Sequence, residues 1–108
     1  MIIVFPSIIA HSFSALSIYP FIFLKDPAFK TDYVLINHEK IHLKQQLELF
    51  WLIFFAWYFI EYLIKLIYYR NSYTAYKNIS FEREAYLHED DLDYLQTRPK
   101  FGFFKYIL

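Results

Sequence analysis

The pattern of apolar and polar positions divides the chain into an extended N-terminal part and a series of predicted helices. Residues 1–24 alternate apolar runs with serine and histidine, and residues 18–24 are rich in strand-forming side chains. Pro20 lies within that run, which favours an edge strand or an extended segment over a central strand. The turn signal Lys-Asp-Pro at residues 25–27 then separates this part from the helices.

The first predicted helix begins beside Thr31 or Asp32, either of which can act as its N-cap, and continues to Glu48. Its polar positions are interrupted by apolar ones at intervals that fit a partly buried helix. These apolar positions are Val34, Leu35, Ile41 and Leu49.

An unbroken apolar run extends from residue 49 to residue 60 and, after Glu61 and Lys65, continues to Arg70. A membrane-spanning helix needs about 20 mostly apolar residues, and this stretch reaches that length only with both charges included. Glu61 and Lys65 are four residues apart and can neutralise each other on one helix face. We therefore predict a spanning or deeply embedded helix, with a buried core helix and a helix lying in the membrane interface as alternatives. Aromatic residues typical of an interfacial belt are Trp51, Trp57, Tyr58, Tyr62, Tyr68 and Tyr69.

Asn71 and Ser72 are expected to end the apolar helix, and a further helix is predicted after a polar and aromatic connector at residues 73–77. Asn78 or Ser80 can cap this helix, which is expected to run to about Leu95 before Pro99 stops it. The aromatic and basic tail, residues 101–108, suits packing back on the protein or contact with lipid headgroups.

Composition supports one mainly helical domain over residues 1–108. Residues of the AVILMFWYC set make up 57% of the chain and aromatics 24%, with one glycine and four prolines, which is typical of a helical membrane or membrane-surface protein. Lysine and arginine equal aspartate and glutamate in number, so the charge balance gives no indication of nucleic-acid binding. Because cysteine is absent, disulfides and thiolate metal ligands are excluded. The apolar start lacks a basic segment, so no secretory signal is predicted.

The motif His38-Glu39-Lys40-Ile41-His42 lies within the first predicted helix and has the form His-Glu-x-x-His. Residues four apart on an α-helix share a face, so His38 and His42 can direct two imidazoles at a single metal ion. Glu39 lies one step round the helix and can reach a metal-bound water as general base. A lone buried histidine is commonly a hydrogen-bonded core residue, but this pair and its glutamate favour a catalytic site with Zn²⁺ as cofactor.

Two histidines leave such a site incomplete, because catalytic zinc has three protein ligands and a water. We predict Glu82 as the third ligand, since it lies in the first turn of the later helix and Ala85 on the same side permits close helix packing. Glu84, the alternative, is rotated by about 200° on that helix, so both glutamates cannot face one metal. The run at residues 89–91 is expected to be a solvated acidic face. Other downstream candidates are His88, Glu89, Asp90, Asp91 and Asp93.

A shared site also constrains the path of the chain. If residues 32–69 formed one straight helix, Tyr69 would lie about 40 Å from His42 at 1.5 Å per residue. The connector from Arg70 to Phe81 could cover that distance only when stretched. The site therefore predicts a bend or reversal at residues 48–58, although no proline or glycine marks one.

These residues resemble the gluzincin metallopeptidases, which pair His-Glu-x-x-His with a glutamate on a later helix. The nearest named pattern is that of membrane-bound CAAX-prenyl-protease-type enzymes, whose third ligand lies in Glu-x-x-Ala-Asp. The matching stretch here is Glu82-Arg83-Glu84-Ala85-Tyr86, with tyrosine where that family has aspartate. The resemblance implies a small helical zincin-like domain that hydrolyses peptide bonds of a peptide or protein substrate at or in a membrane.

By this resemblance, zinc would be bound by His38, His42 and Glu82 and would polarise the scissile carbonyl. Glu39 would take a proton from the zinc-bound water and pass it to the leaving amine. Gln46, one turn beyond His42, could orient a ligand or could be a plain surface or core amide.

Two further roles follow from the same resemblance. The stretch from Tyr19 to Leu24 could form the edge strand that aligns an extended peptide. The candidates for stabilising the oxyanion are Tyr76, Tyr86 and His11.

Residues 37–46 and 78–85 also resemble a group of small bacterial membrane proteins that carries no established activity, and this likeness implies a bacterial inner membrane. Three hypotheses remain open. The first is a membrane-associated zinc metallopeptidase that contacts membrane lipid, the second a non-catalytic metal-binding or structural membrane protein that acts through protein–protein interaction. The third is a soluble helical module whose aromatic surface pairs with itself or with another chain. The sequence does not define an oligomeric state.

Overall fold

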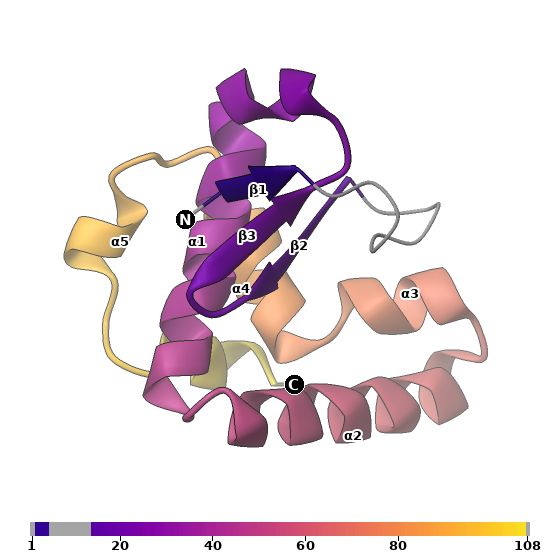
Figure 1. The fold of residues 1–108 in the computed structure, drawn as a ribbon. Helices are drawn as coiled ribbons and strands as arrows, with labels where there is room; N and C mark the ends of the chain where they lie inside the picture. The colour runs from indigo at the N-terminus through magenta and orange to yellow at the C-terminus, as the bar shows by residue number, and fades with distance from the viewer. Residues whose placement is uncertain (1, 5–13, 108) are drawn as a thin grey trace.

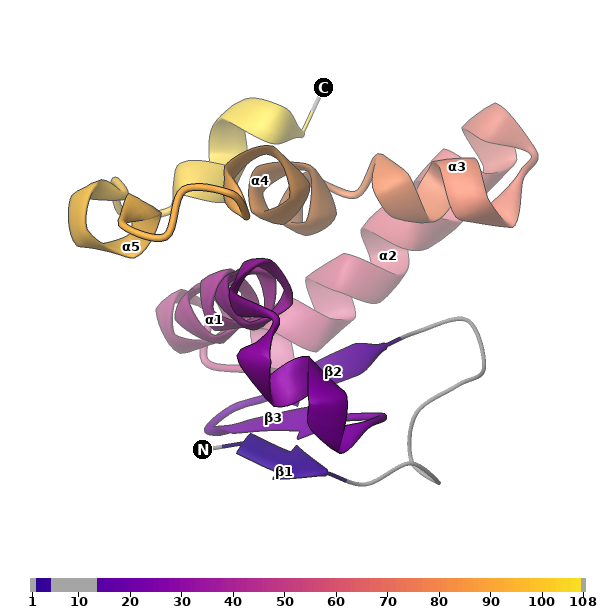
Figure 2. The same cartoon turned by 90° about the horizontal axis from the view of Figure 1, so that it is seen from above.

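The computed structural model describes residues 2–4 and 14–107, and these form a mainly helical domain with a small sheet (Figure 1). Helix α1 lies between the sheet on one side and α4 on the other, and α2 runs across one end of α1 (Figure 2). The strands are β1 (Ile2–Val4), β2 (Ala15–Ile18) and β3 (Phe21–Leu24). The α-helices are α1 (Tyr33–Glu48), α2 (Leu52–Tyr69), α3 (Ser72–Lys77), α4 (Ser80–His88) and α5 (Tyr94–Thr97). Two 3₁₀ helices are η2 (Pro27–Thr31) and η3 (Gly102–Tyr106).

The sheet has the order β1-β3-β2, with β3 parallel to β1 and antiparallel to β2. The predicted edge position of residues 18–24 is therefore wrong, because β3 is the central strand. Pro20 lies in the turn between β2 and β3, where it interrupts no ladder hydrogen bond. Within the part of the chain that the structure describes, β2 pairs with β3 alone and is an edge strand beside α1. Ile22 and Leu24 of β3 pack with Ile36 of α1 in a buried cluster.

Helix α1 has the limits that the sequence predicts. The Asp32 carboxylate caps it by accepting a hydrogen bond from the backbone N–H of Leu35. The chain then bends at residues 49–51, and α2 runs crosswise at the end of α1 (Figure 1), so the predicted bend is confirmed. Phe50 has a left-handed backbone with φ of 49°, and its side chain is 77% exposed. A left-handed backbone costs a residue with a Cβ atom about 1–2 kcal/mol, and Leu49 and Phe54, buried on either side of the turn, offset that cost.

Helix α2 is the one helix among the described residues that is long and apolar enough to cross a membrane, by length and composition. Only Phe54 and Glu61 of its residues are buried, so the alternative of a buried core helix is wrong. Its charges point inward, because Glu61 binds Ser80, and Lys65 donates to the carbonyls of Asn78 and Ile107. The large apolar side chains that α2 exposes are Leu52, Ile53, Phe59, Ile60, Leu63, Ile64, Ile67, Tyr68 and Tyr69.

The C-terminal third differs from the prediction in two places. The whole of the expected connector is helical and lies in α3, which Asn71 caps by accepting from the N–H of Thr74. The helix expected to reach residue 95 ends at His88. It ends there because the Asn37 side-chain amide binds the carbonyls of His88, Glu89 and Asp91 and holds the chain in a turn.

The tail packs back on the protein, which is one of its two predicted positions. Its 3₁₀ helix, η3, lies against α4. Phe103 is buried with Phe54 and Phe81, so residues from α2, α4 and the tail share one core. That core fixes α4 beside α2 and α1.

Candidate metal centre

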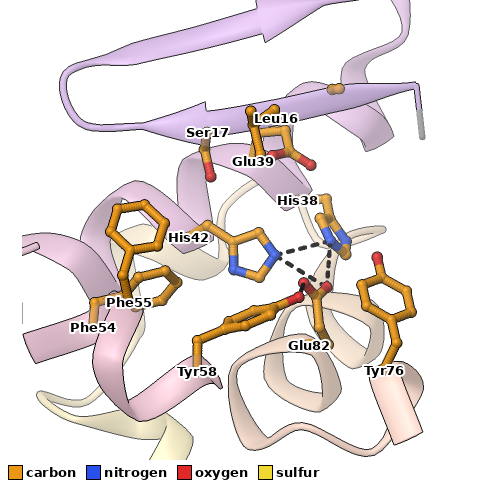
Figure 3. A pocket seen from close by; sticks show the side chains of 11 residues that line it. Leu16, Ser17, His38, Glu39, His42, Phe54, Phe55, Tyr58, Tyr76 and Glu82 are labelled. Atoms are coloured by element: carbon orange, nitrogen blue, oxygen red, sulfur yellow. Dashed lines mark hydrogen bonds and ion pairs between the residues drawn. The ribbon is translucent and has the colours of Figure 1, made fainter. Parts of the chain in front are cut away.

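Three side chains from two helices converge between α1 and α4 (Figure 3). His38 and His42 lie one turn apart on α1, and Glu82 lies in the first turn of α4; all three are buried. The Nε2 atoms of the two histidines are 3.2 Å apart, and each lies 3.1 Å from Oε1 of Glu82. The predicted triad therefore comes together in the structure as a compact triangle of two nitrogens and one oxygen.

The size of this triangle fits a tetrahedral metal ion. With metal–nitrogen and metal–oxygen bonds of about 2.0–2.1 Å, two ligand atoms of a tetrahedral zinc are about 3.3 Å apart. The three observed distances of 3.1–3.2 Å are close to that value. Two imidazoles and one carboxylate also form the ligand set of one class of catalytic zinc site, which leaves the fourth position for water or substrate. The residues present can thus hold a metal ion with an open position.

Both imidazoles are fixed through the nitrogen that faces away from the triangle. Nδ1 of His42 lies 2.8 Å from Oε1 of Gln45, and Nδ1 of His38 lies 3.1 Å from Oε1 of Glu89. Each of these oxygens is an acceptor, so each Nδ1 carries the proton and each Nε2 presents its lone pair to the centre in the neutral ring. Oxygen acceptors behind metal-binding histidines orient the rings and raise their basicity.

Glu89 corrects one prediction. It is not part of a solvated face, because the turn held by Asn37 directs it at His38. Gln46 takes the second of its two predicted roles, that of a core amide: its amide donates to the Ser17 carbonyl and accepts from the Tyr19 N–H. Gln45 takes the orienting role, a possibility that its i+3 spacing from His42 already allows.

Glu82 is held by the two histidines and by one residue that the sequence prediction missed. The Tyr58 hydroxyl of α2 donates to Oε2 of Glu82 at 2.6 Å, which leaves Oε1 to face the histidines. Burial would raise the pKa of Glu82, but His42 and His38 hold it well below its usual range. Burial would lower the pKa of His42, but the effect of the Glu82 carboxylate is larger than that of burial and raises the pKa of His42 to about 9. The group therefore keeps an ionised carboxylate in a buried place, as a cation site requires.

Glu84 points away from the triad, as its rotation on the helix predicts. It is buried and accepts hydrogen bonds from Arg98, Tyr94 and the Gln45 amide. Burial would raise the pKa of Glu84, and Arg98, Gln45 and Tyr94 lower it instead. Gln45 binds both His42 and Glu84. The ion pair of Glu84 and Arg98 therefore holds Gln45, and through Gln45 it holds the His42 ring.

The remaining downstream candidates do not face the triad. His88 stacks on the Tyr94 ring and hydrogen-bonds the Tyr106 hydroxyl. The other three, which are exposed, are Asp90, Asp91 and Asp93.

Glu39 lines a cavity of about 250 Å³ together with all three members of the triad. In Figure 3 it lies on the opposite side of the imidazole pair from Glu82, against Leu16 of β2. Burial raises the pKa of Glu39 above its ordinary range, although His42 and His38 oppose the change. A carboxylate with a raised pKa is a stronger proton acceptor, which suits a general base.

Tyr76 and Tyr86, predicted to stabilise an oxyanion, both lie close to the triad. Tyr76 lines the same cavity, and its hydroxyl lies 2.8 Å from that of Tyr86. The Tyr86 ring packs edge-on against His38, with ring centroids 4.4 Å apart. Tyr76 is thus the better placed of the two, and the third candidate, His11, lies outside the described residues.

The resemblance to gluzincin metallopeptidases stays a prediction. Comparison with protein-family models, with curated protein sequences and with solved structures finds no match to this chain.

Proposed function

We propose that the chain is a membrane-associated, zinc-dependent metallopeptidase. The observation that carries this proposal is the buried triangle of His38, His42 and Glu82 with Glu39 on the wall of the same cavity. A metal site that serves structure alone has no need of an open position or of a general base. Here the cavity lies beside the triangle and is lined by a carboxylate that does not belong to it.

His38, His42 and Glu82 would hold the zinc, which when bound supplies a Lewis acid for the carbonyl and lowers the pKa of water. Glu39 accepts a proton from the water whose oxygen forms the new bond to the carbonyl carbon. Glu39 then gives this proton to the leaving amine as the carbon–nitrogen bond breaks. The Tyr76 hydroxyl, on the cavity wall, is the proposed donor to the oxygen that becomes negatively charged.

Strand β2, rather than β3, is the strand that we propose aligns a peptide substrate. Ala15, Leu16 and Ser17 of β2 line the cavity beside Glu39. Gln46 donates to the Ser17 carbonyl and accepts from the Tyr19 N–H, and these two hydrogen bonds tie this strand to α1 and so fix it relative to the histidines. An extended peptide can bind such a strand through main-chain hydrogen bonds.

The exposed apolar face of α2 is the proposed membrane contact. Ile60, Ile64 and Ile67 are each more than half exposed, and the two charges of the helix, Glu61 and Lys65, are turned to the protein side. Lipid can therefore contact this face without removing a charge from water. This supports the membrane hypotheses over the soluble module.

Replacement of Glu39 by glutamine tests the catalytic proposal. The full chain in phosphatidylcholine nanodiscs is loaded with zinc and assayed on a quenched-fluorescent peptide library. Glu39→Gln should keep one zinc per chain and lose at least 100-fold in hydrolysis, the low end of a general base's contribution. Lys40→Gln, the same new residue at the next, exposed position, is the matched control. Unchanged hydrolysis in Glu39→Gln would eliminate the peptidase. Zinc binding with no hydrolysis in the unaltered chain would favour the non-catalytic hypothesis.

A further inference from the structure

A second, larger hollow lies between α2 and α3, outside the metal centre. It has a volume of about 710 Å³, close to three times that of the cavity at the triad. Among the described residues, its walls are two phenylalanines, five tyrosines and Ser72, and none of these is charged. We call this hollow the aromatic groove.

The aromatic groove adjoins the metal centre. Phe55, Tyr58 and Tyr76 line both the groove and the cavity at the triad. Of these, Tyr58 hydrogen-bonds Glu82, so the groove begins at the carboxylate that faces the histidines. A molecule that reaches the triad along this path therefore places its next part in the groove.

The other end of the groove reaches the exposed face of α2. Phe59, on the groove wall, is 60% exposed and lies next to Ile60, with Leu63 one turn further on. On the α3 side, Tyr73 is 66% exposed. The Lys77 ammonium lies 3.3 Å from the centroid of the Tyr86 ring and 6.0 Å from that of the Tyr73 ring, so one cation lies against two wall residues of the groove. The groove thus lies between the metal centre and the proposed membrane surface, with uncharged lining residues and one cation, Lys77, beside them.

The chemistry of the walls selects one kind of occupant. Aromatic rings bind apolar and aromatic groups through burial and ring contacts, whereas a cationic side chain would lose its hydration and be repelled by the nearby Lys77 ammonium. A volume of this size is that of a drug-sized ligand pocket, sufficient for more than one large side chain.

We propose that the aromatic groove binds the part of the substrate next to the scissile bond and selects large, uncharged, apolar side chains. The inference rests on the proposed function, because it takes the substrate to be a peptide whose scissile bond lies at the triad. It adds that substrates are apolar on one side of that bond and enter from the membrane side of α2.

Filling the groove without touching the metal centre tests this proposal. Ser72 is an exposed residue of the groove wall at the start of α3. The side chain that caps α3 is that of Asn71, so Ser72→Trp adds bulk without removing the cap. Binding is measured by fluorescence polarisation on Glu39→Gln protein in nanodiscs. The probe is a labelled, blocked heptapeptide with leucine and phenylalanine at its centre. The matched peptides carry two alanines or two lysines there.

Ser72→Trp should weaken binding of the leucine–phenylalanine peptide at least tenfold and leave the other peptides within twofold. Ser72→Ala, which removes only the hydroxyl, should bind all three as the parent does, and zinc content should stay at one per chain in every variant. With Glu39 intact, the same loss should appear as a raised KM with kcat retained.

Three results would overturn the proposal. One is equal binding of the three peptides, and another is equal binding of the leucine–phenylalanine peptide with and without Trp at position 72. The third is competition by a free fatty acid with no preference among the peptides, which would make the groove a lipid-chain site. Because these readouts need no hydrolysis, an inactive protein would refute the peptidase while the binding data still decide the role of the groove.

Discussion

The hydroxyl of Tyr58 is a sensitive test of how the metal centre is built. It donates at 2.6 Å to the Glu82 oxygen that does not face the histidines, and it comes from α2 rather than from the two helices that carry the triad. In Tyr58→Phe the ring remains to pack against Phe54 and Phe81, so only this hydrogen bond is lost. The expected effect is therefore on the position of one carboxylate and on zinc affinity.

The magnitude follows from two independent estimates. A hydrogen bond to a charged group contributes about 1.5–3 kcal/mol. Loss of a residue that orients a metal ligand typically weakens metal binding by about 10–100-fold, which corresponds to about 1.4–2.7 kcal/mol. The two ranges overlap almost completely, so we expect Tyr58→Phe to raise the zinc dissociation constant by about 10–100-fold.

Competition with a chromophoric chelator measures this dissociation constant directly on the full chain. Tyr62→Phe is the matched control, since it removes a hydroxyl from α2 one turn further along, on the wall of the aromatic groove. Zinc affinity of Tyr58→Phe within twofold of the unaltered chain would refute the inference that α2 positions Glu82.

Four other outcomes are expected. Arg98→Met should destabilise the fold by about 3–5 kcal/mol in urea unfolding, because Glu84 and Glu48 would remain buried without their cation; a change below 1 kcal/mol would show that this network is not needed. Gly102→Ala should lower the free energy of unfolding by about 1–3 kcal/mol, because the alanine Cβ would lie 2.6 Å from a Glu84 oxygen; an unchanged melting temperature would contradict this. Since the pKa of folded Glu84 is lowered, its stabilisation is present above the unfolded value near 4.5 and lost as pH falls below it; acid unfolding followed by circular dichroism should show this loss, and Glu84→Gln should show a flatter profile. Zinc should raise the melting temperature of the unaltered chain but not of His42→Ala, and equal shifts in both would place the ion elsewhere.

Local geometry accounts for the parts of the site that the sequence predicted. The spacing of His38 and His42 and the 100° turn per residue that separates Glu82 from Glu84 depend only on helix geometry. The bend between α1 and α2 was predicted from the length of the connector that follows α2. No glycine or proline marks the bend, because the exposed Phe50 adopts the left-handed backbone there.

The features that the sequence did not predict depend on contacts between distant residues. Gln45 and Gln46 both lie near the His42 face of α1, and only the position of β2 decides which of them binds the imidazole. Asn37 ends α4 from a point 51 residues earlier in the chain. No periodicity in the sequence carries such information, so α4 was predicted too long and Glu89 was assigned to solvent.

The carboxylate of Glu61 gives α2 a second role. Helix α4 has no capping side chain of its own, and Glu61 supplies one from the neighbouring helix by accepting from both the N–H and the hydroxyl of Ser80 at 2.6 Å. Glu82 lies two residues after Ser80, which Glu61 binds. If α2 contacts a bilayer as proposed, a displacement of α2 would be transmitted to a proposed zinc ligand, and lipid thickness and composition would then affect zinc affinity.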